Sequence, residues 1–177
     1  MNRDWMILLE RQTGLEEVLE TNRAAERYGL ALTREEAELI LAERTRVLRE
    51  QKRVEFGEGI VPRIIDEFCD SDFIDRDNYA DTVVRLQEIF YLYKNEMQDE
   101  VSDEELLHFM REQFEEICFG DLDYLEGTCL NIFAQAVRAG YRGYRASEGR
   151  GEYGKFDEVK RWDPELYLEA LRELCWR

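Results

Sequence analysis

Helix-start signals recur along this chain and constrain it to a helical fold. A hydroxyl residue is followed three positions later by glutamate at Thr13–Glu16, Thr33–Glu36 and Ser102–Glu105. In this capping box, the hydroxyl and the carboxylate satisfy backbone N–H groups that a helix start leaves unpaired. Each box precedes apolar residues spaced three and four apart, which is the period of one helix face. The sequence therefore predicts helices that begin near residues 13, 33 and 102.

Further apolar stripes predict the rest of the fold. The densest stripe lies between Asp77 and Met97 and comprises Tyr79, Val83, Leu86, Phe90, Tyr93 and Met97. Ile89 and Leu92 widen it, so we expect this helix to lie at the centre and to contact neighbours on several sides. Shorter stripes predict helices after Pro62, over residues 122–136 and from residue 163 onward. The sequence thus predicts an all-α bundle of about six or seven helices, in a single domain that spans residues 1–177.

The net charge of −17 limits the partners that we expect. A strongly negative field repels polyanions, which argues against nucleic acid and anionic membranes and favours a basic partner. The apolar run Trp5–Leu9 is too short for a signal-peptide core or a membrane span. The four cysteines, Cys69, Cys118, Cys129 and Cys175, form no Cys-x-x-Cys pair, so we expect free thiols and a cytoplasmic protein.

Several patterns resemble metal or phosphate sites but are incomplete. Glu105 and His108 have the Glu-x-x-His spacing of bundle di-iron sites, which need two such pairs, and the chain has one histidine. The aspartates of residues 70–77 fail the spacing of a calcium loop in both registers, and we expect Asp75 or Asp77 to cap the central helix. Gly57 and Gly59 resemble part of a phosphate-binding loop, but the lysine that such a loop requires does not follow them. We therefore predict neither a metal nor a cofactor.

Two regions are candidates for function. Tyr91, Lys94 and Glu96, with Asn95, lie near the end of the central helix and could support acid–base chemistry if they lined a pocket. The second region is a glycine-rich arm at residues 140–162. From residue 138 to 161 the chain has a charge of +3, against −20 for the remainder. The arm interleaves aromatic and basic residues: Tyr141, Arg142, Tyr144, Arg145, Arg150, Tyr153 and Lys155.

The composition of the arm favours a protein–protein interface, because tyrosine and arginine dominate binding energy at such surfaces. The alternatives are that the arm docks on its own acidic body or binds nucleic acid. The leading hypothesis is a non-enzymatic interaction or regulatory protein with an unidentified protein partner. An enzyme or small-ligand binder with a pocket near Tyr91, Lys94 and Glu96 is the alternative. A homodimer formed through surplus apolar surface of the central helix is a third hypothesis.

Several blocks of residues 22–138 resemble an uncharacterised bacterial family, a domain of unknown function. The blocks are Tyr28–Thr33, Val54–Pro62, Phe68–Ser71, Asn78–Tyr79, Glu88–Tyr91 with Lys94–Glu96, Ser102–Leu106 and Leu125–Thr128. That family has no assigned activity, cofactor or catalytic residue, so the resemblance implies no function.

Overall fold

The computed structural model describes residues 3–55 and 59–140, and this part of the chain is helical without a strand. The elements are α1 (Arg3–Glu26), α2 (Arg34–Glu50), α3 (Val61–Phe68), α4 (Tyr79–Glu96), α5 (Asp103–Glu116), α6 (Leu122–Tyr124), η1 (Leu125–Leu130) and α7 (Asn131–Arg138). The prediction of an all-α bundle is confirmed. The arm at residues 140–162, apart from Gly140, and the C-terminal helix predicted from residue 163 lie outside the described residues.

Two of the three capping boxes start helices as predicted. The Thr33 hydroxyl accepts a hydrogen bond from the Glu36 N–H at 3.1 Å, and the Glu36 carboxylate accepts one from the Thr33 N–H at 2.8 Å. Ser102 and Glu105 make the same reciprocal pair at the start of α5. Pro62 lies in the first turn of α3, where its missing N–H costs nothing.

The prediction of a helix start at Thr13 is wrong. α1 begins ten residues earlier, at Arg3, and continues through Thr13 without a break. The Thr13 hydroxyl instead donates a hydrogen bond to the Leu9 carbonyl at 2.9 Å, a common arrangement for threonine inside a helix. α1 stops at Glu26, and Gly29 follows with a φ of 78°, a left-handed conformation that is common for glycine just after a helix.

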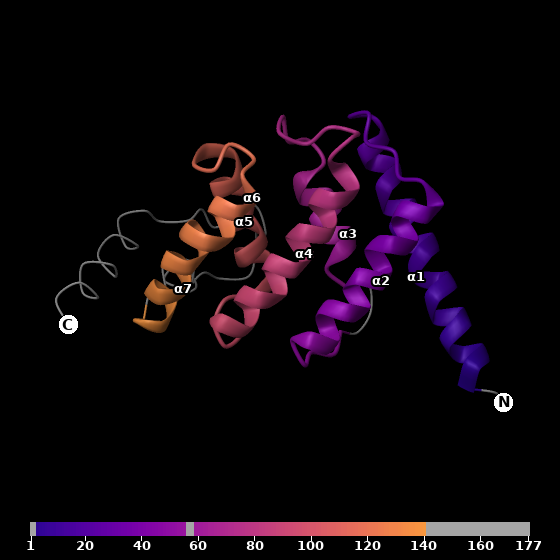
Figure 1. The fold of residues 1–177 in the computed structure, drawn as a ribbon, viewed down its shortest axis with the longest axis horizontal. Coiled ribbons are helices and arrows are strands. Elements are labelled where there is room, and N and C mark those ends of the chain that lie inside the picture. The colour runs from indigo at the N-terminus through magenta and orange to yellow at the C-terminus, as the bar shows by residue number, and fades with distance from the viewer. Residues whose placement is uncertain (1–2, 56–58, 141–177) are drawn as a thin grey trace, which may run out of the picture.

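α4 is the central element of the fold. It contacts α2, α3 and α5, and Figure 1 shows α2 on one side of it and α7 on the other. Leu86, Ile89 and Phe90 are all buried by these neighbours. The prediction of a central helix that packs on several sides is therefore confirmed. The apolar side chains of α4, proposed to form a homodimer surface, are mostly buried within the molecule.

The buried polar groups of the core hold loops in place. The Tyr79 hydroxyl donates a hydrogen bond to Asn22 Oδ1 at 2.5 Å, and Asn22 Nδ2 donates to the Leu30 carbonyl at 3.1 Å. Gln87 Nε2 donates to the Ile40 carbonyl at 3.0 Å. Burial without a partner would be costly for each of these groups. These contacts fix the turn between α1 and α2 and the packing of α2 on α4.

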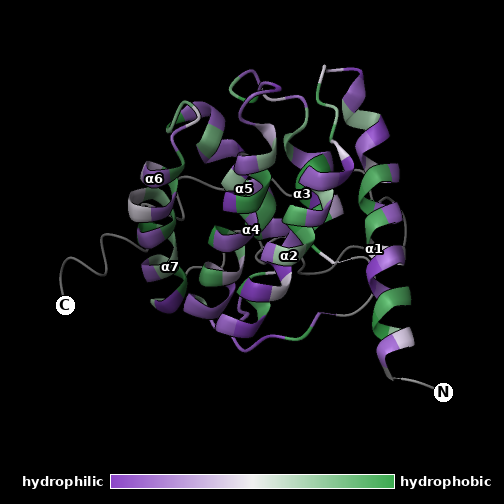
Figure 2. Ribbon diagram, turned by 45° about the vertical axis from the view of Figure 1, so that its right-hand side comes forward, coloured by the Kyte–Doolittle hydropathy of each residue, from purple (hydrophilic) through white to green (hydrophobic). Residues whose placement is uncertain are grey.

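The first part of α1 differs from the rest of the described chain because it contributes no residue to the core. Residues 4–13 are all exposed, whereas Leu15, Val18 and Ala25 of the same helix are buried. Figure 2 shows hydrophobic residues on this part of α1, which extends beyond the other helices. Within residues 3–55 and 59–140, each helix is too short or too polar to span a lipid bilayer.

Candidate functional site

Lys94 at the carboxyl end of α4 is buried, with 5% of its surface exposed. Its Nζ donates a hydrogen bond to the Val101 carbonyl at 2.6 Å and pairs with Asp103 Oδ1 at 2.9 Å. Asp99 Oδ1 lies 3.6 Å away. These partners belong to the turn between α4 and α5 and to the first residue of α5. Lys94 therefore acts as an internal clamp that holds the turn against α4.

Tyr91 is also buried, one turn earlier on α4. Burial, and then the neighbouring Glu55 carboxyl, raise the pKa of Tyr91 well above its usual value. Glu55 accepts a hydrogen bond from Arg44 Nε at 2.6 Å, which forms a half-buried ion pair. A hydroxyl with a raised pKa beside a carboxylate and a guanidinium group is a feature of some active sites. In this protein the Arg44–Glu55 ion pair joins α2 to the segment that precedes α3.

Glu96 does not join Tyr91 and Lys94. Its carboxylate is exposed and lies 3.4 Å from Arg138 at the end of α7. Asn95 turns toward α2, where Nδ2 donates to the Gln51 carbonyl at 2.9 Å and Oδ1 accepts from Arg53 at 2.7 Å. The residues of the predicted pocket thus contact different elements, and Tyr91 and Lys94 serve packing.

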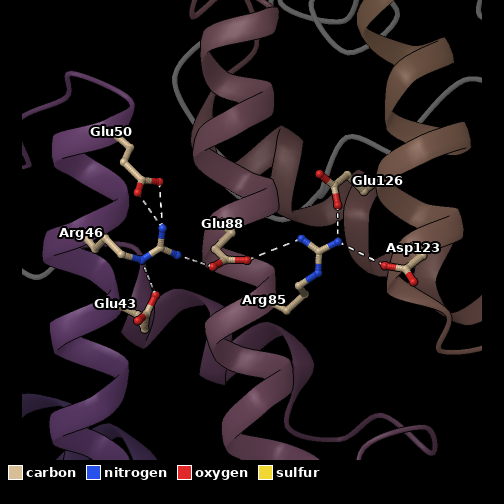
Figure 3. A network of polar contacts seen from close by, with 7 residues as sticks. All are labelled: Glu43, Arg46, Glu50, Arg85, Glu88, Asp123 and Glu126. Carbon is tan, nitrogen blue, oxygen red and sulfur yellow. Dashed lines mark hydrogen bonds and ion pairs between the residues drawn. The ribbon is translucent and has the colours of Figure 1, made fainter.

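A network of ion pairs crosses the face formed by α2, α4, α6 and η1 (Figure 3). Arg46 bonds Glu43 at 2.7 Å, Glu50 at 2.8 Å and Glu88 at 2.6 Å. Glu88 also pairs with Arg85 at 3.5 Å, so that it links the two guanidinium groups. Glu43 and Glu50 raise the pKa of Arg46 above its usual value. Both guanidinium groups are surrounded by acids, and this face is anionic overall.

Arg85 connects α4 to α6 and η1. It pairs with Asp123 at 3.2 Å and closely with Glu126, at the start of η1. The Tyr93 hydroxyl donates to the Glu126 carbonyl, and burial followed by Glu126 and Glu96 raises the pKa of Tyr93 to about 12. η1 is a π-helix. This form is rare in proteins, and where it occurs it is often at a functional site. The apolar stripe over residues 122–136 gave no sign of it.

A shallow hollow opens next to this connection. Its volume is about 450 Å³, and it lies between the amino end of α4 and the turn that leads into α6. The lining residues are Asn78, Asp81, Thr82, Arg85, Gly120, Asp121, Leu122 and Asp123. Sequence analysis singled out none of these side chains as a site, because the two segments are about 40 residues apart in the chain.

The chain matches the model of a family of unknown function, DUF6323, over residues 17–143. The protein belongs to this family. No curated protein and no solved structure gives a significant match to the chain. The resemblance predicted from the sequence is confirmed, and the match extends a few residues beyond both predicted ends. The hollow lies inside the DUF6323 match, whereas Trp5–Leu9 and most of the arm lie outside it.

The remaining candidates within the DUF6323 match have structural roles. Cys118 Sγ and Cys129 Sγ lie 3.5 Å apart and are buried as free thiols. Burial and the neighbouring thiol raise the pKa of Cys118 to about 12, and burial raises that of Cys129, which makes both poor nucleophiles. The prediction that Asp75 or Asp77 caps α4 is wrong, because the N-cap is Asn78 and no side chain caps this helix. Asp75 instead accepts hydrogen bonds from the N–H groups of Asp77 and Asn78 in the loop just before α4.

Glu105, from the predicted Glu-x-x-His pair, is occupied by its capping bond to the Ser102 N–H. His108 Nδ1 lies 3.7 Å from Glu67 Oε1, so the pair does not converge. The arm residues Tyr141, Arg142, Tyr144, Arg145, Arg150, Tyr153 and Lys155 lie outside the described residues.

Proposed function

We propose that this protein works by binding another protein and that the first turns of α1 form the contact. The observation that carries the proposal is the exposure of five consecutive apolar residues, Trp5–Leu9. Trp5 is 60% and Leu8 58% exposed, and Leu8 lies seven residues, or two helical turns, before the buried Leu15. Large exposed apolar patches on soluble proteins commonly mark interaction sites.

The form of this surface indicates what kind of partner fits. Side chains spaced three and four apart on a helix pack into the groove of another helix or between two helices. A helix whose residues 4–13 are all exposed gains little from packing, so a partner would also stabilise it. The chain's net charge of −17 attracts a basic surface. The proposed partner is therefore a protein with an apolar groove flanked by basic residues.

The arm belongs to the same proposal. Its alternation of tyrosine with arginine or lysine is typical of interface hot spots. Replacing Arg142, Arg145 and Arg150 together with glutamine should weaken partner binding if the arm takes part. Unchanged binding would limit the interface to α1.

We further propose that the protein works in the bacterial cytoplasm. The support is that Cys118 and Cys129 remain thiols although their sulfur atoms are only 3.5 Å apart. In an oxidising compartment, such a close pair would be expected to form a disulfide.

The test is native mass spectrometry on the protein purified gently from its own host, beside two double variants. Trp5→Glu with Leu8→Glu removes the proposed contact. Leu39→Glu with Val54→Glu removes two other exposed apolar side chains and is the matched control. We expect one specific protein complex with the wild type and the control but not with the α1 variant. A complex that survives in the α1 variant would contradict the proposal, and a homodimer would identify the partner as a second copy.

A further inference from the structure

We propose that the hollow between α4 and the α5–α6 turn binds an alkylammonium group, such as the end of a lysine side chain or a free alkylamine. The proposal does not depend on α1 or on the arm. It rests on the charge of the hollow, on the Thr82 hydroxyl, which has no hydrogen-bond partner among the described residues, and on the spacing of the carboxylates.

Among the described residues, the hollow carries more negative charge than its lining cation neutralises. Asp81, Asp121 and Asp123 line it, and Arg85 is the cation among its lining residues. Arg85 is already bonded to Glu88, Asp123 and Glu126. The Asp81 carboxylate makes no ion pair or hydrogen bond within the described part of the chain. A bound cation would therefore meet carboxylates whose charge exceeds that of the guanidinium beside them.

Thr82 provides an independent sign of a ligand. It lines the hollow, is 7% exposed, and its hydroxyl has no hydrogen-bond partner among residues 3–55 and 59–140. The helical residues Thr13 and Thr45 behave differently, since each donates to the carbonyl four residues earlier, at 2.9 and 3.1 Å. The Thr82 hydroxyl therefore has a free acceptor position that a group bound in the hollow can use.

The spacing of the acids favours an organic cation over a metal ion. In the described residues, no three His, Cys, Asp or Glu side chains are close enough to hold one metal ion. The carboxylates instead surround about 450 Å³. An ammonium group has three N–H donors that can reach separate acceptors, here the Thr82 hydroxyl and the aspartates.

Leu122 is an apolar lining residue of the hollow, and the methylene groups that carry the ammonium can pack against it. Phe119, next to the lining residue Gly120, is 67% exposed although its φ of 48° is unusual for a residue with a side chain. Its ring lies 6.2 Å from that of Phe73. A Cβ on Gly120 would lie 2.7 Å from Phe73 Cβ, so glycine is required for this close approach. Glycine at position 120 thus allows the turn that leads into α6 to pack closely on Phe73.

The test is isothermal titration calorimetry at low ionic strength with cadaverine and with the blocked peptide acetyl-Ala-Lys-Ala-amide. The diol 1,5-pentanediol is the uncharged control. We expect the diol not to bind and at least one amine to bind. A tighter peptide would identify a polypeptide as the natural source, and tighter cadaverine would identify a free amine. If neither amine binds, or if the diol binds equally well, the proposal is overturned.

Variants separate this site from general attraction to an acidic protein. Asp81→Asn with Asp123→Asn should weaken amine binding roughly tenfold, and Thr82→Val roughly threefold. Glu16→Gln with Glu104→Gln removes the same charge from exposed positions on α1 and α5 and should leave binding nearly unchanged. Equal losses in both double variants would overturn the proposal. The Trp5→Glu/Leu8→Glu variant should bind the amine normally, so failure of the proposed protein partner would not be confused with failure here.

Discussion

At the scale of single residues, Lys94 shows how a polar group that suits chemistry can instead stabilise the fold. The backbone passes through left-handed conformations at Gln98 and Asp99, with φ of 53° and 57°. This turn brings the Val101 carbonyl and Asp103 back to the Lys94 ammonium. A sequence pattern cannot show that the chain turns back in this way, so Lys94 could be read equally well as part of a pocket.

We expect Lys94→Met to lower the free energy of unfolding by about 2–3 kcal/mol, because it leaves the Val101 carbonyl without its hydrogen bond and Asp103 without its cation. Urea denaturation followed by circular dichroism would measure the loss. Arg63→Met, at an exposed position of α3, is the control and should change stability by less than about 0.5 kcal/mol. Equal losses in the two variants would show that Lys94 is not a structural clamp.

At the scale of helices, the three capping boxes of identical spacing provide an internal comparison. Thr33→Ala and Ser102→Ala should each cost about 1 kcal/mol, because each removes a hydroxyl that satisfies an N–H at a helix start. Thr13→Ala should cost almost nothing, since Thr13 lies inside α1 and alanine is the better helix former. Thermal unfolding of the three variants would measure this, and a loss at Thr13 as large as at Thr33 would contradict the position of α1.

The stability that Glu36 contributes to the protein, at the start of α2, depends on pH. The hydrogen bond from Arg76, followed by that from the Thr33 backbone, lowers the pKa of Glu36 below its usual value of 4.5. A lowered pKa means that the carboxylate contributes stability above pH 4.5 and loses it as the pH falls through the folded value. Glu36→Gln should therefore be less stable at pH 7, by under about 1 kcal/mol because the pair is largely in water. Urea unfolding at neutral and acidic pH should show this difference shrinking at acidic pH, and an equal difference at both would exclude the mechanism.

The helices were predictable because their signals are local. These signals are the capping boxes, Pro62 and the apolar spacing, which act within a few residues. They correctly predicted the helices α2, α3, α4 and α5 and the central position of α4. The start of α1 was not predictable, because Thr13 fits a cap and a helix interior equally well. The π-helix η1 depends on Arg85 and Tyr93 of another helix. The hollow depends on Thr82 meeting a segment that follows residue 119, and such contacts leave no pattern along the sequence.

At the scale of the whole molecule, the described chain consists of a packed body and an extension of α1 that contributes no residue to the core. The core begins at Leu15 and Val18, whereas residues 4–13 are exposed. Burial of apolar surface supplies most of the favourable free energy of folding. The extension therefore contributes little to stability in this structure, and its apolar residues are available for another surface.

Removing residues 1–12 should change the free energy of unfolding by less than about 0.5 kcal/mol, because no core contact is lost. The helical signal in circular dichroism should fall by the part that the extension contributes, while the unfolding transition stays cooperative. The matched comparison is Leu15→Ala with Val18→Ala, which leaves the extension in place and should cost several kcal/mol through cavities in the core. A loss above about 2 kcal/mol on truncation would mean that the protein covers its own extension, with residues 141–177 as the segment to test. A negligible loss together with loss of the protein complex would assign the extension to binding.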